Sequence, residues 1–312
     1  MNVISLSKLI KKYGALIAVN SISFSVKKGE IFGLLGPNGA GKTTTLEIIE
    51  GLQPPTKGKI SVVGLDPVKN QIKVKEKIGV QLQSSAFFDY LTLTELINLF
   101  KSYYKTDSEI DSKKLLEMVG LETKKKARVS QLSGGQKQRF SIIVALVNDP
   151  EIIFLDEPTT GLDPQSRRNL WEIIRDIRKN GKTVVMTTHY MEEAQALCDR
   201  IAIMDQGKII AIGTPSQLIN KLEYTFRIIY RGKQCIDDTK IKNIDGIIKT
   251  IYEYNEQNKQ HTCIFGVKKV QDVLPKIINL LQKNKLPFED LEVIPSSLED
   301  VFLKLTGKEL RE

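Results

Sequence analysis

Short apolar runs that end in polar residues recur along the first two thirds of the chain. The runs at 31–35, 78–82 and 152–155 consist mainly of Ile, Val, Leu and Phe, and a similar run at 183–188 ends in Thr. Continuous apolar runs of this length are typical of strands buried on both faces of a parallel sheet. Helix-forming segments follow at 43–49 and 140–147. The alternation predicts an α/β fold with a parallel sheet at its centre.

The pattern between residues 84 and 145 is helical. Thr92 and Glu95 have the spacing of a capping box, in which each side chain accepts a hydrogen bond from the other residue's backbone. The apolar residues behind it recur at helical spacing, at Leu96, Leu99, Phe100 and Tyr103. We therefore expect a helical subdomain over about 84–145, inside a first domain over 1–222.

Residues 223–312 carry a different pattern. The runs at 224–230 and 247–252 are typical of strands, and an apolar stripe over 273–281 has helical spacing. Ser297 precedes a last helix in which Leu298, Val301, Phe302 and Leu305 share one face. This segment is predicted to be a small α+β domain, and it contains no constellation of chemically active residues.

Composition places the chain in the globular class. Its 312 residues are 41% hydrophobic, and 46 basic side chains outweigh 37 acidic ones. Cys198, Cys235 and Cys263 are widely separated and odd in number, so the sequence indicates neither a disulfide framework nor a zinc site. The first residues lack the apolar core of a signal peptide, and no apolar run has the length of a membrane span. We expect a cytosolic protein whose role at a membrane requires a partner.

Residues 36–43 match the phosphate-binding pattern G-x-x-x-x-G-K-[ST] between a predicted strand and a predicted helix. Glycines let the backbone wrap around phosphate oxygens where a Cβ would collide. Lys42 adds a cation for the β- and γ-phosphates, and Thr43 offers a hydroxyl to Mg²⁺. The loop predicts that the chain binds a nucleoside triphosphate.

Two further elements are suited to handling phosphate. Asp156 and Glu157 end the buried run at 152–155, where one carboxylate can orient Mg²⁺ and the other can polarise an attacking water. Ser133 is a predicted N-cap, and the helix that opens at Gly134 would present free N–H groups to an anion. Taken alone, this second element is better explained as an ordinary capped helix.

The order of these motifs resembles the nucleotide-binding subunit of ATP-binding-cassette (ABC) transporters. The phosphate loop is followed by Gln83, by Leu-Ser-Gly-Gly-Gln at 132–136, by Asp156-Glu157, by Gly161-Leu162-Asp163 and by His189. The resemblance covers about 1–220 and implies a P-loop NTPase cassette. Such a cassette has a RecA-like core with antiparallel β and helical subdomains, here followed by the C-terminal α+β domain.

The resemblance also implies roles for individual residues. Glu157 would be the general base, with His189 and Lys42 completing the catalytic set. Mg²⁺ would be held by Thr43, Gln83 and Asp156. Two cassettes would pair head to tail, so that Ser133 and Gly135 bind the γ-phosphate of the ATP held by the opposite copy. The residues expected to contact ATP are Tyr13, Gly36, Asn38, Gly39, Gly41, Lys42, Thr43, Thr44, Gln83, Ser133, Gly134, Gly135, Gln136 and Asp163.

The ending at 295–307 resembles cassettes of drug-resistance and lipid or polysaccharide exporters that use a separate permease chain. The predicted function is an ATP-hydrolysing subunit, peripheral on the cytoplasmic side of the membrane, that couples cassette dimerisation to export. The alternative is a soluble ABC ATPase acting on ribosomes or DNA. No nucleic acid is expected as a partner under the first reading. The cargo, the permease and the role of 223–312 are not determined by the sequence.

Overall fold

The computed structural model describes residues 1–82, 87–104, 111–234, 241, 244–256, 259–287 and 290–307. Gln83 and Cys235 therefore lie outside the described residues. The chain divides into two compact units, Met1–Pro215 and Ser216–Glu309. Each unit contains a hydrophobic cluster of its own. The domain boundary predicted after residue 222 stays a prediction.

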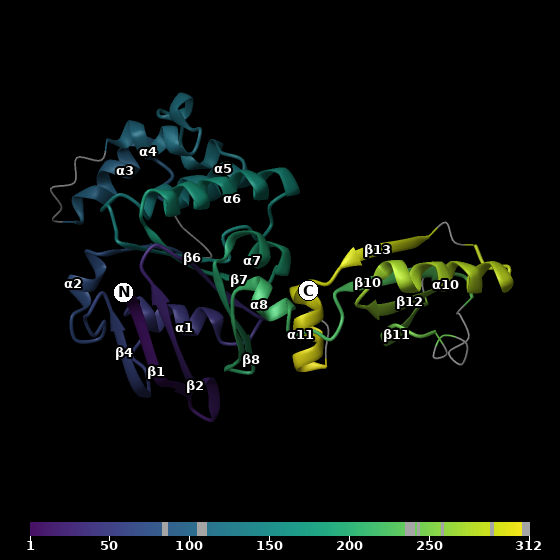
Figure 1. Cartoon of the computed structure of the whole chain (residues 1–312). Helices are drawn as coiled ribbons and strands as arrows, with labels where there is room; N and C mark the ends of the chain where they lie inside the picture. The colour runs from purple at the N-terminus through teal and green to yellow at the C-terminus, as the bar shows by residue number, and fades with distance from the viewer. Residues whose placement is uncertain are drawn as a thin grey trace. The chain divides into compact units, whose positions relative to one another are not determined.

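The first unit combines two sheets with helices (Figure 1). Its strands are β1 (Asn2–Tyr13), β2 (Leu16–Lys27), β3 (Ile31–Leu35), β4 (Lys57–Val62), β5 (Ile78–Gln81), β6 (Ile152–Asp156), β7 (Thr183–Thr188), β8 (Arg200–Asp205) and β9 (Lys208–Gly213). Its helices are α1 (Lys42–Ile49), α2 (Gln71–Lys75), α3 (Leu93–Ser102), α4 (Ser112–Met118), α5 (Gly134–Val144), α6 (Pro164–Lys179) and α7 (Met191–Leu197), with 3-10 turns η1 (Glu122–Lys124) and η2 (Val129–Gln131).

The larger sheet carries the motifs. Its strand order is β5-β6-β7-β3-β8-β9, with β9 antiparallel to β8 and the other neighbours parallel. Strands β3 and β6 are buried throughout. Each has a hydrogen-bonded strand on both sides, and other elements of the unit cover both faces of the sheet. The phosphate loop follows β3, Glu157 follows β6 and His189 follows β7, so their side chains meet at one edge of this sheet.

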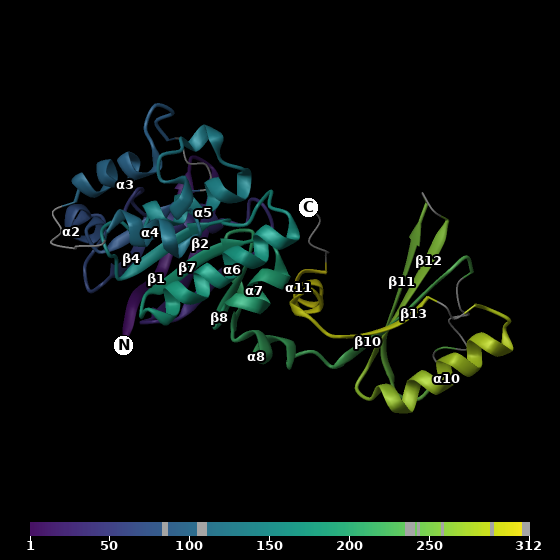
Figure 2. The same ribbon diagram turned by 90° about the horizontal axis from the view of Figure 1, so that it is seen from above.

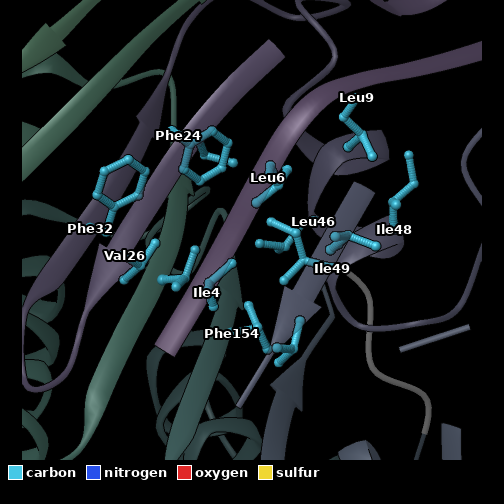
Figure 3. Close-up of a cluster of buried hydrophobic side chains, with 14 of the residues drawn as sticks. Ile4, Leu6, Leu9, Phe24, Val26, Phe32, Leu46, Ile48, Ile49 and Phe154 are labelled. Carbon is cyan, nitrogen blue, oxygen red and sulfur yellow. The ribbon is translucent and has the colours of Figure 1, made fainter. Parts of the chain in front are cut away.

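A second, antiparallel sheet in the order β2-β1-β4 encloses the core from the other side of α1. Figure 3 shows Leu46, Ile48 and Ile49 of α1 among Ile4 and Leu6 of β1, with Phe154 of β6 nearby. These side chains are at most 4% exposed. Each buried Leu or Ile contributes roughly 1.5–3 kcal/mol, so this cluster anchors the helix that begins at the phosphate loop.

The helical subdomain contains α3, α4 and α5. The predicted capping box is present, since Thr92 N–H donates to Glu95 Oε2 at 2.8 Å and Glu95 N–H donates to Thr92 Oγ1 at 3.3 Å. Leu96 is buried as predicted, together with Ile97. Tyr103, the last residue of the predicted stripe, is the C-cap of α3; it is 65% exposed, and its ring lies edge-on to that of Phe100.

We expect Gly79→Ala to destabilise the joint between the sheet and the helical subdomain. An added Cβ at Gly79 in β5 would stand 1.8 Å from the carbonyl oxygen of Ala145, just beyond α5. Overpacking of this kind costs about 1–3 kcal/mol of unfolding free energy. Urea unfolding measures the change, with Gly134→Ala as the control because no heavy atom lies within 4 Å of a Cβ there. Equal stability of the two variants would contradict the packing described.

The second unit is an antiparallel sheet packed with one long helix (Figure 2). Its elements are α8 (Pro215–Ile219), β10 (Phe226–Gly232), β11 (Ile247–Asn255), β12 (Gln260–Val267), α10 (Val270–Lys283), β13 (Leu291–Pro295) and α11 (Leu298–Thr306). The strand order β11-β12-β10-β13 places the two sequence-adjacent strands β11 and β12 side by side and β10 in the interior. Val273, Ile277 and Leu281 of α10 are buried as their spacing predicted. No described helix is long and apolar enough to cross a membrane.

Candidate functional site

The phosphate loop has a backbone that requires glycine at two positions. Gly41 has φ 94°, in the left-handed region, and a Cβ there would lie 2.4 Å from the carbonyl oxygen of Ala18 in β2. A Cβ at Gly36 would lie 2.3 Å from the carbonyl oxygen of Met204 in β8. The backbone of the loop therefore lies close against Ala18 of β2 and Met204 of β8. Because α1 begins at Lys42, its first N–H groups have no partner within the helix and are available to phosphate oxygens.

Lys42 lies at the centre of the site. Its Nζ donates to the carbonyl oxygens of Gly36 at 2.9 Å and Pro37 at 3.2 Å, and it is 3.3 Å from Glu157 Oε1. The side chain is 4% exposed. A buried ammonium group beside the phosphate loop suits a polyphosphate ligand. Phosphate oxygens would then replace the two carbonyl oxygens as the acceptors of the Lys42 hydrogen bonds.

Asp156 joins the phosphate loop to the sheet. Thr43 Oγ1 donates to Asp156 Oδ1 at 3.3 Å, and the hydroxyl of Thr187 in β7 donates to the same oxygen. A hydroxyl and a carboxylate are hard oxygen ligands of the kind that Mg²⁺ takes together with substrate phosphates. Among the described residues no group of three His, Cys, Asp or Glu side chains could hold a metal by itself.

Glu157 is held in an unusual backbone conformation. Its φ is 46°, which is rare for a residue other than glycine, and its N–H donates to Thr187 Oγ1 at 2.9 Å. Its carboxylate lies between two groups, with Oε2 at 3.3 Å from His189 Nδ1 and Oε1 facing Lys42. Thr160 Oγ1 also donates to Oε2 at 3.3 Å. The structure thus brings the three predicted catalytic residues together.

The charge of Glu157 depends on these neighbours. Burial opposes its ionisation, but the charge of Lys42 and the contact with His189 outweigh burial and hold the pKa of Glu157 below its ordinary value of 4.5. The carboxylate is therefore ionised at neutral pH, as a base must be.

We expect Lys42→Met to raise the pKa of Glu157, because burial remains while the main neighbouring cation is lost. The measurement is a carboxyl NMR titration, with Lys77→Met as control because Lys77 pairs with Glu151 at the surface. In the wild type the lowered pKa stabilises the fold above the unfolded-state value near 4.5, and this contribution is lost as the pH falls through the folded-state pKa. The variant should lose less stability on acidification. An unchanged Glu157 pKa would refute the assigned pairing.

Helix α5 begins at the surface, within the Leu-Ser-Gly-Gly-Gln sequence at 132–136, and is called the signature helix below. Ser133 is its N-cap and forms a capping box with Gln136, whose Oε1 accepts from Ser133 N–H and from Lys124 Nζ, both at 3.1 Å. Ser133 and Gly134 are exposed. A Cβ at Gly135 would lie 3.0 Å from Ser166 Oγ in α6. The N–H groups of Ser133 and Gln136 donate within the capping box, whereas those of Gly134 and Gly135 at the helix start can donate to a ligand from outside the chain.

Other predicted residues lie as follows. Asp163 is the N-cap of α6, and its carboxylate accepts from Ser166 N–H at 2.9 Å and from Ser166 Oγ at 2.6 Å, which lowers its pKa. Tyr13 ends β1 with a 43% exposed ring, and its hydroxyl donates to Gln53. Asn38 and Gly39 are exposed in the phosphate loop, and Thr44 is half-buried in α1. Gln83 lies outside the described residues.

Thr187 is a site residue that sequence reasoning missed. It connects the side chain of Asp156 with the backbone of Glu157, as described above. The parallel register pairs Asp156 with Thr187, whose neighbour Thr188 ends β7 just before His189. The available signal was the pair of threonines that ends the run at 183–188 just before His189.

Comparison with known proteins identifies the family. The family model described as ABC transporter matches residues 19–160. The chain is 39% identical to Nod factor export ATP-binding protein I of Burkholderia orbicola (strain AU 1054), over 97% of this chain and 96% of that protein. It is 38% identical to linearmycin resistance ATP-binding protein LnrL of Bacillus subtilis (strain 168), over 97% of each chain.

Solved structures agree with the fold. An ATP-binding subunit of an ABC transporter matches with a TM-score of 0.63 and 28% identity, covering 70% of this chain and 92% of that chain. A dimeric, post-hydrolysis ATP-binding cassette bound to ADP and Pi matches with a TM-score of 0.60 and 29% identity, covering 68% of this chain and 98% of that chain. The predicted cassette fold is confirmed. The chain belongs to the ATP-binding cassettes of the ABC transporter family, ATPases that bind and hydrolyse ATP.

Proposed function

We propose that this chain is the ATP-hydrolysing subunit of an exporter, working with a separate integral-membrane permease. The observation that carries the proposal is the identity of 38–39%, over 97% of this chain, to ATP-binding proteins named for Nod factor export and for linearmycin resistance. Those matches cover 97% of this chain and therefore include most of residues 223–312, whereas the two solved cassettes cover 68–70% of it. The cargo stays open, because a permease rather than a cassette contacts it.

Within one chain, different residues bind the nucleotide, hold the metal and act in hydrolysis. The phosphate loop and Lys42 hold the β- and γ-phosphates, and Tyr13 stacks on the adenine. Thr43 and Asp156 would hold Mg²⁺, which would supply positive charge to offset that of the phosphates. Glu157 accepts a proton from the attacking water, and His189 beside it at 3.3 Å orients that water toward the γ-phosphate. When Lys42 turns to the phosphates, Glu157 loses a neighbour that lowers its pKa and becomes a stronger base.

The second half of the site is proposed to come from a second copy of the chain. Ser133 and Gly134, which are exposed, and Gly135, which is half-buried, form a helix start that suits the γ-phosphate of a facing copy. Solved structures of related cassettes are dimeric. ATP would then close the homodimer, and hydrolysis with product release would reopen it.

The same proposal places the protein on the cytoplasmic side of the membrane, held there by its permease. Deleting the gene for the cognate multispanning protein should release the chain from the membrane fraction, and affinity purification from solubilised membranes should recover both. Recovery with ribosomes or DNA instead would favour the alternative of a soluble ABC ATPase. The excess of 46 basic over 37 acidic side chains would fit that alternative, but the identity of 38–39% to export and resistance ATP-binding proteins supports the exporter.

A further inference from the structure

The hydroxyl of Tyr13 is bound by a residue that belongs to none of the sequence motifs. Tyr13 Oη donates to Oε1 of Gln53, which lies in the segment between α1 and β4. The tyrosine is 43% exposed, and Gln53 is half-buried. An exposed hydroxyl can also bond to water, so this hydrogen bond is not needed to satisfy a buried donor. Its effect is to fix where the Tyr13 ring lies.

The amide of Gln53 is oriented by a carboxylate of α1. Gln53 Nε2 donates to Glu47 Oε2 at 2.8 Å. Because a carboxylate accepts hydrogen bonds and does not donate them, the NH₂ end of the amide has to face Glu47. The carbonyl end is then left to accept from the Tyr13 hydroxyl. Two hydrogen bonds thus connect the ring with α1, and we call the side chains of Tyr13, Gln53 and Glu47 the Gln53 link.

The backbone at Gln53 is held by the same two elements. Gln53 N–H donates to the carbonyl oxygen of Glu47 at 3.3 Å, which places it in the turn that ends α1. From β1, Lys11 Nζ donates to the carbonyl oxygen of Pro54 at 2.8 Å and lies 5.0 Å from the centre of the Tyr13 ring. The end of β1 is therefore fastened to the end of α1 on both sides of the Gln53 side chain.

Helix α1 connects this turn with the phosphate loop. Its first residue is Lys42, and Leu46, Ile48 and Ile49 anchor its buried face in the core (Figure 3). The loop that suits phosphates therefore lies at the start of α1, and the Gln53 link attaches the Tyr13 ring near its end. Since ATP joins its base covalently to its phosphates, the position of the ring relative to α1 decides whether both ends of the nucleotide can be held at once.

We propose that Gln53 is a positioning residue, which fixes the Tyr13 ring for stacking on the base by tying its hydroxyl to α1. The inference rests on the proposed stacking of Tyr13 on adenine. It assigns Gln53 no contact with ATP, and it assigns the Tyr13 hydroxyl to the protein and not to an edge of the base. Loss of Gln53 should raise the Kd and KM for ATP and leave kcat unchanged, because no catalytic residue belongs to the link.

The first test compares Gln53→Leu with Gln71→Leu, the same substitution at an exposed glutamine in the first position of α2. Loss of one hydrogen bond changes an equilibrium constant by up to about tenfold, so we expect the Kd for ATP to rise about 3- to 10-fold in Gln53→Leu. Gln71→Leu should bind ATP like the wild type. An unchanged Kd in Gln53→Leu, or a fall in kcat as large as the rise in Kd, would overturn the proposal.

Inorganic tripolyphosphate separates the position of the ring from damage to the phosphate loop. It offers the phosphates of ATP without a base, so its Kd should be the same in Gln53→Leu and in the wild type. Weakening of tripolyphosphate binding to the same extent as ATP binding would also overturn the proposal, because Gln53 would then act on α1 and the phosphate loop.

A double-mutant cycle tests whether Gln53 acts through the tyrosine hydroxyl. Tyr13→Phe keeps the ring and removes only the group that bonds to Gln53. It should raise the Kd for ATP about as much as Gln53→Leu does, and the double variant should be no weaker than either single one. Fully additive effects would contradict the link. Should Gln53→Leu lose cooperative unfolding, Tyr13→Phe is held to the same contrast between ATP and tripolyphosphate.

Tyr13→Ala distinguishes this inference from the stacking on which it rests. Loss of the ring should raise the Kd for ATP about 5- to 100-fold, the range for loss of base stacking. A large effect of Tyr13→Ala with none of Gln53→Leu rejects only the positioning role. Unchanged ATP binding in Tyr13→Ala rejects the stacking itself.

Discussion

Replacing Glu157 with Gln is expected to lower the ATP turnover of the purified chain by about 10²- to 10⁴-fold, the range for loss of a general base. Gln has the size of Glu and can still accept a hydrogen bond from water, but it cannot take up a proton at neutral pH. The contacts that hold the phosphates belong to Lys42 and the loop at 36–43, so the KM or Kd for ATP should change little. ATP should accordingly accumulate bound and unhydrolysed.

Single-turnover kinetics and direct ATP binding measure the two quantities separately. Glu151→Gln is the matched control, because Glu151 immediately precedes the same strand β6 and pairs with Lys77 at the surface. It should hydrolyse ATP like the wild type. Undiminished turnover in Glu157→Gln would remove this residue from the role of base and shift it to a structural one.

The catalytic side of the site could be predicted largely from the sequence. The motif residues follow strands of one parallel sheet in the same direction, and the carboxyl ends of such strands meet at one edge. Lys42, Glu157 and His189 are accordingly found together. Thr187 was missed because its importance depends on the lateral register of β6 and β7, which a single sequence does not fix.

The fold was predicted less completely where tertiary pairing decides the outcome. The helical spacing after Thr92 predicted α3 but not its end, because Tyr103 continues the apolar pattern beyond the helix. In the second unit, β10, β11 and α10 were predicted, whereas β12 and β13 were not. Strand β12 begins with the polar residues Gln260, His261 and Thr262, which do not predict a strand by themselves. They belong to the sheet because β12 pairs with both β10 and β11.

The burial of Glu193 in α7 is a further feature that could not be predicted from the sequence. Glu192 and Glu193 are adjacent and chemically identical, yet one is exposed and the other is 1% exposed. The helical period of α7 explains which face is buried once the helix is placed. Trp171 as the hydrogen-bond partner could only be found from the packing of α6 against α7.

The central claim is that each ATP site is shared between two copies of the chain, and a pair of inactivating substitutions tests it. Lys42→Ala removes the cation of the phosphate loop. Gly134→Glu places a carboxylate at the first position of α5, where no heavy atom lies within 4 Å of a Cβ and an acidic side chain suits the helix start. In a shared site that carboxylate would face the γ-phosphate held by the partner and repel it.

Each substitution alone should lower turnover by about 10²- to 10³-fold, as loss of a group that stabilises developing charge does. Ser112→Glu, at the first position of α4, is the control for an added carboxylate at a helix start and should remain active. Stability of the variants is checked by thermal unfolding, because the claim concerns the site and not the fold.

The decisive measurement is the turnover of a heterodimer that combines one Lys42→Ala copy and one Gly134→Glu copy, isolated through two different affinity tags. In a head-to-tail dimer both defects fall in one site, and the other site joins an intact phosphate loop to an intact signature helix. We predict about half of the wild-type turnover, from one intact site of two. Turnover as low as that of either variant alone would contradict the shared site.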